Sequence, residues 1–130
     1  MIAAILESGE LERLYTGLSL LVSAAAEGRP ARGLAGFGAL APLLDDRLAA
    51  RALRPEETPH LTVPGRETFA RSLAELRDLA RELEDCRIWA CAAAVETTGV
   101  SAGDVEARLD GVMSTPRFLK EIGDAQLVVV

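Results

Sequence analysis

Residues 87–99, RIWACAAAVETTG, have the pattern of a buried strand that passes the chain to a short helical turn and a loop. The apolar run of Ile88, Trp89 and Ala90 ends in Cys91, and small residues then lead to a glycine. A short apolar run bounded by turn-forming residues is typical of a buried strand. In an open parallel sheet, ligands and reactive groups collect at the carboxyl ends of the strands. We therefore expect Cys91 to lie at such an edge.

Apolar runs alternate with helical periodicities along the rest of the chain. We expect strands at residues 1–6, 32–37, 87–91, 111–113 and 127–130. We expect helices at residues 10–27, 39–53 and 68–85, around Val105 and Leu109, and around Phe118, Leu119 and Ile122. This alternation predicts an α/β fold, a three-layer α/β/α sandwich with a mostly parallel five-stranded sheet and right-handed crossovers. No internal repeat is present, so residues 1–130 are predicted to form a single domain.

Local signals place the ends of several helices. Ser8 is a candidate N-cap for the first helix, and Ser101 with Asp104 forms a capping-box-like start. Thr115 is a second candidate cap, with Pro116 in the first helical position.

Prolines and a glycine predict a loop over residues 54–66. Loops of that length often act as lids or interface arms. His60 lies in this loop, where it is either an ordinary exposed histidine or within reach of a neighbouring active site.

Composition limits the function classes. The chain has 130 residues, of which 49% are hydrophobic and 26% are charged, as expected for a globular protein. A formal net charge of −6 disfavours electrostatic binding to nucleic acid or to an anionic membrane. The first residues lack a basic region, and no apolar run reaches membrane-spanning length. These features predict a cytoplasmic protein with neither a nucleic-acid nor a membrane partner.

The two cysteines, Cys86 and Cys91, are expected to be reduced in that compartment. If the strand is extended, their separation is roughly 16 Å at about 3.3 Å per residue, too far for a disulfide within one chain. The only histidine is His60, and neither cysteine has a CxxC partner. We therefore predict no metal site.

Several segments resemble the DsrE/DsrF/DsrH family. The strand ending in Cys91 and the following TTGVSAGDVEARLDGV are similar to that family's cysteine motif and the segment after it. The opening MIAAIL resembles the family's first strand, and AAAEGRPARGLAGF resembles its passage from the first helix to the second strand. The closing TPRFLKEIGDAQLVVV resembles the family's last helix and strand. The resemblance covers nearly the whole chain through short, degenerate patterns.

This resemblance implies a DsrE-like, flavodoxin-like domain that handles sulfur. Sulfur-carrier members hold a persulfide on a cysteine at the end of a central strand, and Cys91 matches that position. By this resemblance, the protein is a sulfur carrier or sulfurtransferase of a sulfur relay, without a cofactor of its own. Relatives form homotrimers or hexamers, so a homo-oligomer is expected, together with a protein that donates or accepts sulfur.

Two other functions remain open from the residues. Cys91 can simply pack, in a non-catalytic oligomeric module that binds a small anionic or nucleotide-like ligand. A thiol peroxidase-like protein would need a resolving thiol, and Cys86 lies too far away within one chain.

A carrier also needs a cation near its sulfur. No Lys or Arg follows Cys91 within the motif, and Glu96 has the wrong sign. A cation would have to come from elsewhere, such as Arg117, Lys120 or another subunit.

Overall fold

Five short segments form one sheet in the computed structural model, which describes residues 1–130. The strands are β1 (Ile2–Leu6), β2 (Ala31–Ala35), β3 (Cys86–Cys91), β4 (Val112–Met113) and β5 (Gln126–Val129). The helices are α1 (Leu11–Ala26), α2 (Phe37–Leu44), α3 (Leu48–Ala52), α4 (Val63–Glu82), α5 (Ala92–Thr98), α6 (Ala102–Arg108) and α7 (Thr115–Ile122).

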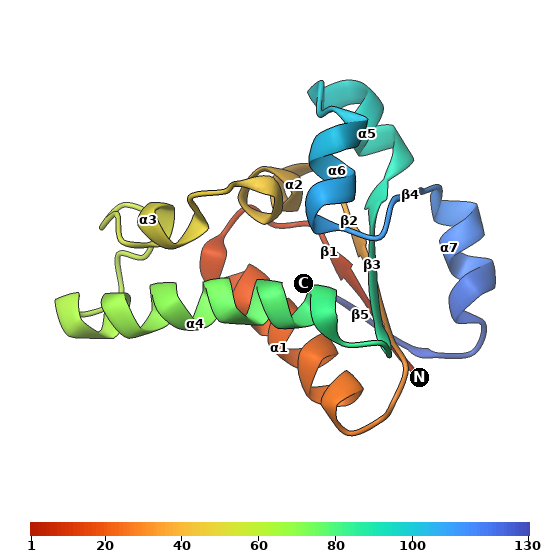
Figure 1. The fold of residues 1–130 in the computed structure, drawn as a ribbon, viewed down its shortest axis with the longest axis horizontal. Coiled ribbons are helices and arrows are strands. Elements are labelled where there is room, and N and C mark those ends of the chain that lie inside the picture. The colour runs from red at the N-terminus through yellow and green to blue at the C-terminus, as the bar shows by residue number, and fades with distance from the viewer.

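The sheet is entirely parallel, with strand order β4-β3-β2-β1-β5. From β1 to β4 the chain steps across the sheet in one direction, and it then returns past β1 to add β5. Right-handed crossovers place helices on opposite faces of a sheet when the stepping direction reverses. The connection through α7 therefore covers the face opposite the other helices (Figure 1). The predicted three-layer, flavodoxin-like α/β/α sandwich is confirmed.

The two faces of the sheet are covered to very different extents. On one face, α1 and α4 pack against the strands, and side chains of α2 and α6 complete the layer. Gly17 of α1 lies so close to Leu6 that an added Cβ would overlap the leucine side chain. We call this the covered face of the sheet.

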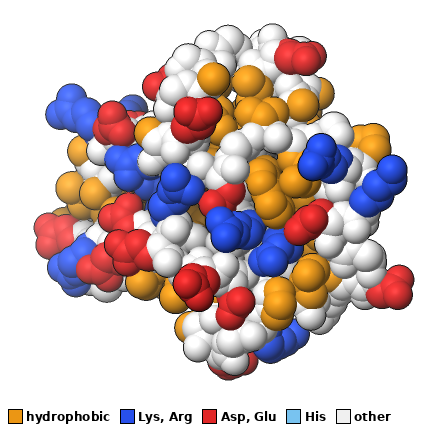
Figure 2. Space-filling model, turned by 45° about the vertical axis from the view of Figure 1, so that its right-hand side comes forward, with side chains coloured by type: hydrophobic (Ala, Val, Ile, Leu, Met, Phe, Trp, Pro, Cys, Tyr) orange, Lys and Arg blue, Asp and Glu red, His pale blue; other side chains and the backbone are white.

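The opposite face, which we call the α7 face, carries a single eight-residue helix. Phe118 is fully buried beneath α7, and its ring meets Trp89 of β3 edge-on with centroids 6.3 Å apart. Arg32 of β2 reaches Glu121 of α7 across a distance of 3.7 Å. Figure 2 turns the α7 side toward the viewer and shows hydrophobic side chains at the surface beside Lys and Arg.

The last strand differs from the sequence expectation. The apolar run at 127–130 predicted a buried strand, yet Leu127 is 45% and Val129 is 64% exposed. The physical reason is position, because β5 pairs only with β1 and forms an edge of the sheet that α7 leaves open. The strand exists as predicted, but it is not buried.

Several predicted boundaries also change. Ser8 is not the N-cap of α1, which is Glu10, although the Ser8 hydroxyl accepts the Glu10 N–H at 3.0 Å. The second strand ends at Ala35, because Gly36 caps α2. The predicted helix over 39–53 is two helices, α2 and α3, separated by a turn around Asp45. Ser114, rather than Thr115, caps α7 by accepting the Arg117 N–H at 3.4 Å.

The predicted loop is shorter than expected and is held in place. Thr62 accepts the Gly65 N–H, so α4 begins at Val63 and the loop covers residues 53–62. Buried Arg66 donates from Nε to the fully buried Thr58 hydroxyl at 2.9 Å. Its Nη2 donates to the Thr58 and Leu61 carbonyls, both at 3.0 Å. The buried arginine thus ties the loop to the start of α4.

No helix of this chain combines the length and the apolar character that crossing a membrane requires.

Candidate functional site

Cys91 lies at the carboxyl end of β3, as the sequence predicts. It is the last residue of the strand, it is 9% exposed, and it directly precedes α5. Side chains alternate along a strand, so Cys91 shares the α7 face with Trp89, whereas Cys86 and Ile88 point to the covered face. The candidate nucleophile therefore lies on the thinly covered side of the sheet.

The expected helical turn after Cys91 is present. Cys91 occupies the N-cap position of α5 with extended backbone angles, φ −65° and ψ 126°. Its side chain accepts no capping hydrogen bond from the first turn. Free amide N–H groups at the start of a helix can stabilise a thiolate, but here the sulfur is not bonded to the helix amides.

Cys86 is in a contrasting environment at the other end of the same strand. It is 2% exposed and belongs to the hydrophobic core. Burial, together with the nearby negative charge of Asp110, raises the pKa of the Cys86 thiol to about 11. Both cysteines are free, and Cys86 is protonated and sealed at neutral pH.

The strand that pairs with Cys91 leads directly into α7, and α7 carries two cations without an ion-pair partner. Cys91 pairs in register with Met113 of β4, and the next residue, Ser114, caps α7. A surface hollow of about 370 Å³ is lined by Ser114, Pro116, Arg117 and Lys120. Arg117 and Lys120, which the sequence named as possible cations, are exposed on α7. The β3–β4 pairing thus brings Cys91 close to the start of the helix that carries both charges.

Backbone contacts fix the neighbouring loops at this edge of the sheet. The loop after β1 meets the start of α2 at Gly9 and Gly38, where an added Cβ on Gly9 would lie 2.9 Å from the Gly38 carbonyl oxygen. The Glu7 N–H donates to the Val130 carbonyl at 3.0 Å. These contacts join the carboxyl ends of β1, β2 and β5 into one rigid rim.

His60 lies with a different group of residues. It is exposed, with its Nε2 3.8 Å from a Glu12 carboxylate oxygen at the start of α1. A hollow of about 270 Å³ there is lined by Glu10, Glu12, Glu56, Glu57, Pro59 and His60. No group of three or more His, Cys, Asp or Glu side chains is arranged to hold a metal ion. His60 therefore belongs to an acidic surface hollow beside α1 and α3.

A second polar cluster, on the covered face, was not anticipated from the sequence. Arg77 of α4 is only 6% exposed and lies beside Arg108, the last residue of α6. Arginines that alternate with acids along an amphipathic helix usually lie on its solvated face. The signal for Arg77 is its place in the buried stripe of α4, four residues after Leu73 and three before Ala80.

Fold and site together define a class: a parallel α/β protein with a free, largely buried cysteine at the carboxyl edge of its sheet. Comparison with family models gives no match for this sequence, and comparison with curated proteins gives none either.

Proposed function

We propose that this protein is a DsrE-like sulfur carrier in which Cys91 transiently holds a persulfide. One observation carries the proposal: of two free, buried cysteines on one strand, Cys91 is the more exposed, at 9% against 2%, and it lies at the carboxyl end of the strand, where reactive groups gather. The resemblance of the sequence around Cys91 to the DsrE/DsrF/DsrH family supports the same function.

The transfer would need no cofactor or external oxidant. The Cys91 thiolate attacks the outer sulfur of a donor persulfide, a new sulfur–sulfur bond forms, and the donor leaves as a thiolate. An acceptor thiolate then attacks the outer sulfur on Cys91, which regenerates the Cys91 thiolate. One sulfur atom moves in each step, and oxidation of one partner balances reduction of the other.

Positive charge near the sulfur would favour the thiolate and guide an anionic donor. Arg117 and Lys120 form no ion pair within the chain, and they lie on the helix that starts one residue after the register partner of Cys91. They are the cations best placed to meet a persulfide or thiolate that approaches this edge.

Self-association belongs to the same proposal. The open edge strand β5 exposes Leu127 and Val129, a surface that another copy would cover in a trimer or hexamer. A donor or acceptor protein would then approach the carboxyl edge of the sheet, where Cys91 lies.

The test is intact-mass spectrometry after incubation with a small-molecule persulfide donor, followed by a reductant chase. We expect the wild-type protein to gain one sulfur atom, reversibly, and Cys91→Ser to gain none. Cys86→Ser is the matched control and should gain sulfur like the wild type, because the sealed Cys86 thiol takes no part.

One observation favours a second function, a ligand-binding module in which Cys91 only packs. Cys91 is 9% exposed and accepts no capping hydrogen bond. If no sulfur adduct forms on the native protein, and iodoacetamide labels Cys91 only after denaturation, the carrier proposal is wrong and the binding module stands.

A further inference from the structure

Arg77 is held at the end of α2 by one of its three nitrogens. Its Nη1 donates to the carbonyl oxygens of Leu43 at 3.2 Å, Pro42 at 3.4 Å, and Asp45. These carbonyls lie at the carboxyl end of α2, where the helix dipole favours a cation. The rest of the guanidinium group is not needed for this capping.

The Nε–H of Arg77 is buried without a hydrogen-bond partner. Buried donors are nearly always satisfied by protein, water or a bound ligand. Arg77 lines a small inner cavity of about 10 Å³ and a neighbouring surface hollow of about 130 Å³. The unsatisfied donor therefore belongs to a side chain that faces unfilled space.

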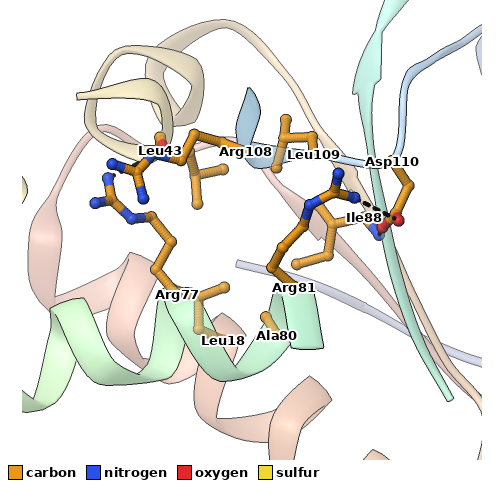
Figure 3. A pocket seen from close by; sticks show the side chains of 9 residues that line it. All are labelled: Leu18, Leu43, Arg77, Ala80, Arg81, Ile88, Arg108, Leu109 and Asp110. Atoms are coloured by element: carbon orange, nitrogen blue, oxygen red, sulfur yellow. Dashed lines mark hydrogen bonds and ion pairs between the residues drawn. The ribbon is translucent and has the colours of Figure 1, made fainter. Parts of the chain in front are cut away.

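Arg108 brings a second guanidinium group to the same space. Figure 3 shows Arg77 of α4 and Arg108 of α6 turned toward one another, while Arg81 reaches across to Asp110. Desolvation and then the positive charge of Arg108 lower the pKa of Arg77, and the negative charges of Asp78, Asp45 and Asp46 offset part of that shift. Two like charges held together in this way favour an anion between them.

The carboxylates around Arg77 and Arg108 leave room for an anion between the two guanidinium groups. Asp110 is committed elsewhere, since it pairs with Arg81 at 3.1 Å and accepts the Ile88 N–H at 2.8 Å. Asp46 and Asp78 reach Arg108 at 3.0 and 3.5 Å, but their side chains are 85% and 60% exposed. Ion pairs this exposed are weak, so a better ligand can displace them. Glu82, which also lines the surface hollow, is exposed as well.

The surface hollow has the size of a small oxyanion. A single water needs roughly 10–15 Å³ on the same measure of volume, so a hollow of about 130 Å³ has room for a group of several heavy atoms. Guanidinium groups bind phosphate oxygens through paired N–H donors, often in a bidentate manner.

We propose that Arg77 and Arg108 form a binding site for a tetrahedral oxyanion, either inorganic phosphate or the phosphate of a monoester. The hollow opens to the surface, so the remainder of an ester would extend into solvent. This site lies on the covered face of the sheet and makes no use of Cys91, so it stands independently of the sulfur-carrier proposal.

The test is calorimetric titration of the full-length protein with inorganic phosphate and, separately, with glycerol phosphate at matched ionic strength. Arg108→Gln removes one of the two guanidinium groups near the surface and leaves the buried Arg77 cap intact. We expect it to weaken phosphate binding about tenfold or more, the effect of losing a charge-assisted hydrogen bond.

Arg71→Gln is the matched control. Arg71 is exposed on α4, the helix that also carries Arg77, and its substitution removes the same charge as Arg108→Gln does. The Arg71→Gln variant should bind phosphate as the wild type does. Tighter binding of glycerol phosphate would identify an ester as the ligand, and tighter binding of inorganic phosphate would identify the free ion. Absence of binding by both, or equal binding by Arg108→Gln and the wild type, would overturn the proposal.

Discussion

The two faces of this sheet differ in how well they are covered. The covered face packs against α1 and α4, with α2 and α6 completing the layer, whereas the α7 face carries one eight-residue helix. The covering of both faces follows from the same rule of right-handed crossovers, applied to a chain that makes three crossovers in one direction, from β1 to β4, and then one in the other direction to β5. The difference teaches that one topology can provide a thickly covered core on one side of a sheet and a thinly covered face on the other.

The cysteines of β3 show what this difference does to chemistry. Cys86 points to the covered face, where burial raises its pKa to about 11. Cys91 lies five residues further on, faces the α7 side, and is at the limit of burial with 9% exposed. An odd separation along one strand is enough to place two thiols in different environments.

The strongest test of the α7 face is Phe118→Ala. Phe118 is fully buried and is the aromatic contact between α7 and Trp89 of the sheet. We expect the free energy of unfolding to fall by about 3–5 kcal/mol, measured by urea denaturation. Trp89 fluorescence should also change, because its aromatic neighbour is lost.

Leu119→Ala is the control, since Leu119 is 53% exposed and its substitution should change stability by no more than about 0.5 kcal/mol. Equal effects of the two variants would mean that α7 does not pack on the sheet.

The stability of the protein at alkaline pH shows how completely the covered face buries the Cys86 thiol. Its folded-state pKa of about 11 exceeds the ordinary value of 9.0. Below pH 9 the thiol is neutral in both states, so this contribution to stability is complete. As the pH rises through the folded-state pKa, the unfolded state loses the proton first and the contribution disappears.

The wild type should lose up to about 3 kcal/mol between pH 9 and 11 through this group. The measurement is the difference in pH slope between the wild type and Cys86→Ala, both followed by urea denaturation. Parallel slopes would show that Cys86 is not sealed and would weaken the contrast between the two faces.

A smaller effect is expected where the covered face joins the carboxyl edge of the sheet. Gly9→Ala would drive a methyl group against the Gly38 carbonyl oxygen, which cannot move without shifting α2. We expect a loss of about 1–3 kcal/mol in thermal or urea unfolding. Gly103→Ala provides the comparison, because an added Cβ there meets only the Ser101 hydroxyl oxygen at 3.9 Å and alanine favours the helix, so stability should not fall. If Gly9→Ala is as stable as the wild type, the rim of loops is not rigid.

The smallest effect is expected at the open part of the α7 face. Val129 is 64% exposed on β5, so Val129→Lys should change the unfolding free energy of an isolated chain by at most about 0.5 kcal/mol. Analytical ultracentrifugation of wild type and variant at several concentrations would show whether another copy covers this strand. A large, concentration-dependent loss of stability in Val129→Lys would mean that another copy covers β5, as the proposed self-association requires, whereas a monomeric wild type would contradict that self-association.

Local pattern predicted the elements of this fold well. The five strands, the helix after Cys91 and the Ser101 cap, which accepts the Asp104 N–H at 3.1 Å, all follow from residues close in sequence. The predicted cap of α7 was wrong by one residue: the sequence pointed to Thr115 and the cap is Ser114, because either hydroxyl can cap a helix and tertiary packing decides between them. The exposure of β5 also could not be predicted, because an apolar run does not show whether its strand is central or at an edge.

The candidate sites were also predicted only in part from the sequence. The edge position of Cys91 follows from the strand pattern, and its 9% exposure depends on how far α7 reaches across the sheet. The burial of Arg77 was missed because arginines in an amphipathic helix are usually exposed, and the burial of Arg66 was missed because the sequence placed it in the 54–66 loop and not in α4. Their spacing from Ala70, Leu73 and Ala80 carried the signal, since all five residues form one stripe.

The pairing of β1 with β5 has a consequence for how the chain folds. Ile2 of the first strand pairs in register with Gln126 of the last, so this pairing closes a loop of nearly the whole chain. Pairings between distant segments form slowly, because the entropy of loop closure must be lost before the contacts form. We therefore expect β1 to β4 and their helices to assemble first, with docking of β5 as the final step. During biosynthesis, the edge of β1 would stay open until the last strand is made, which makes this edge the point where a nascent chain is most exposed to misassembly.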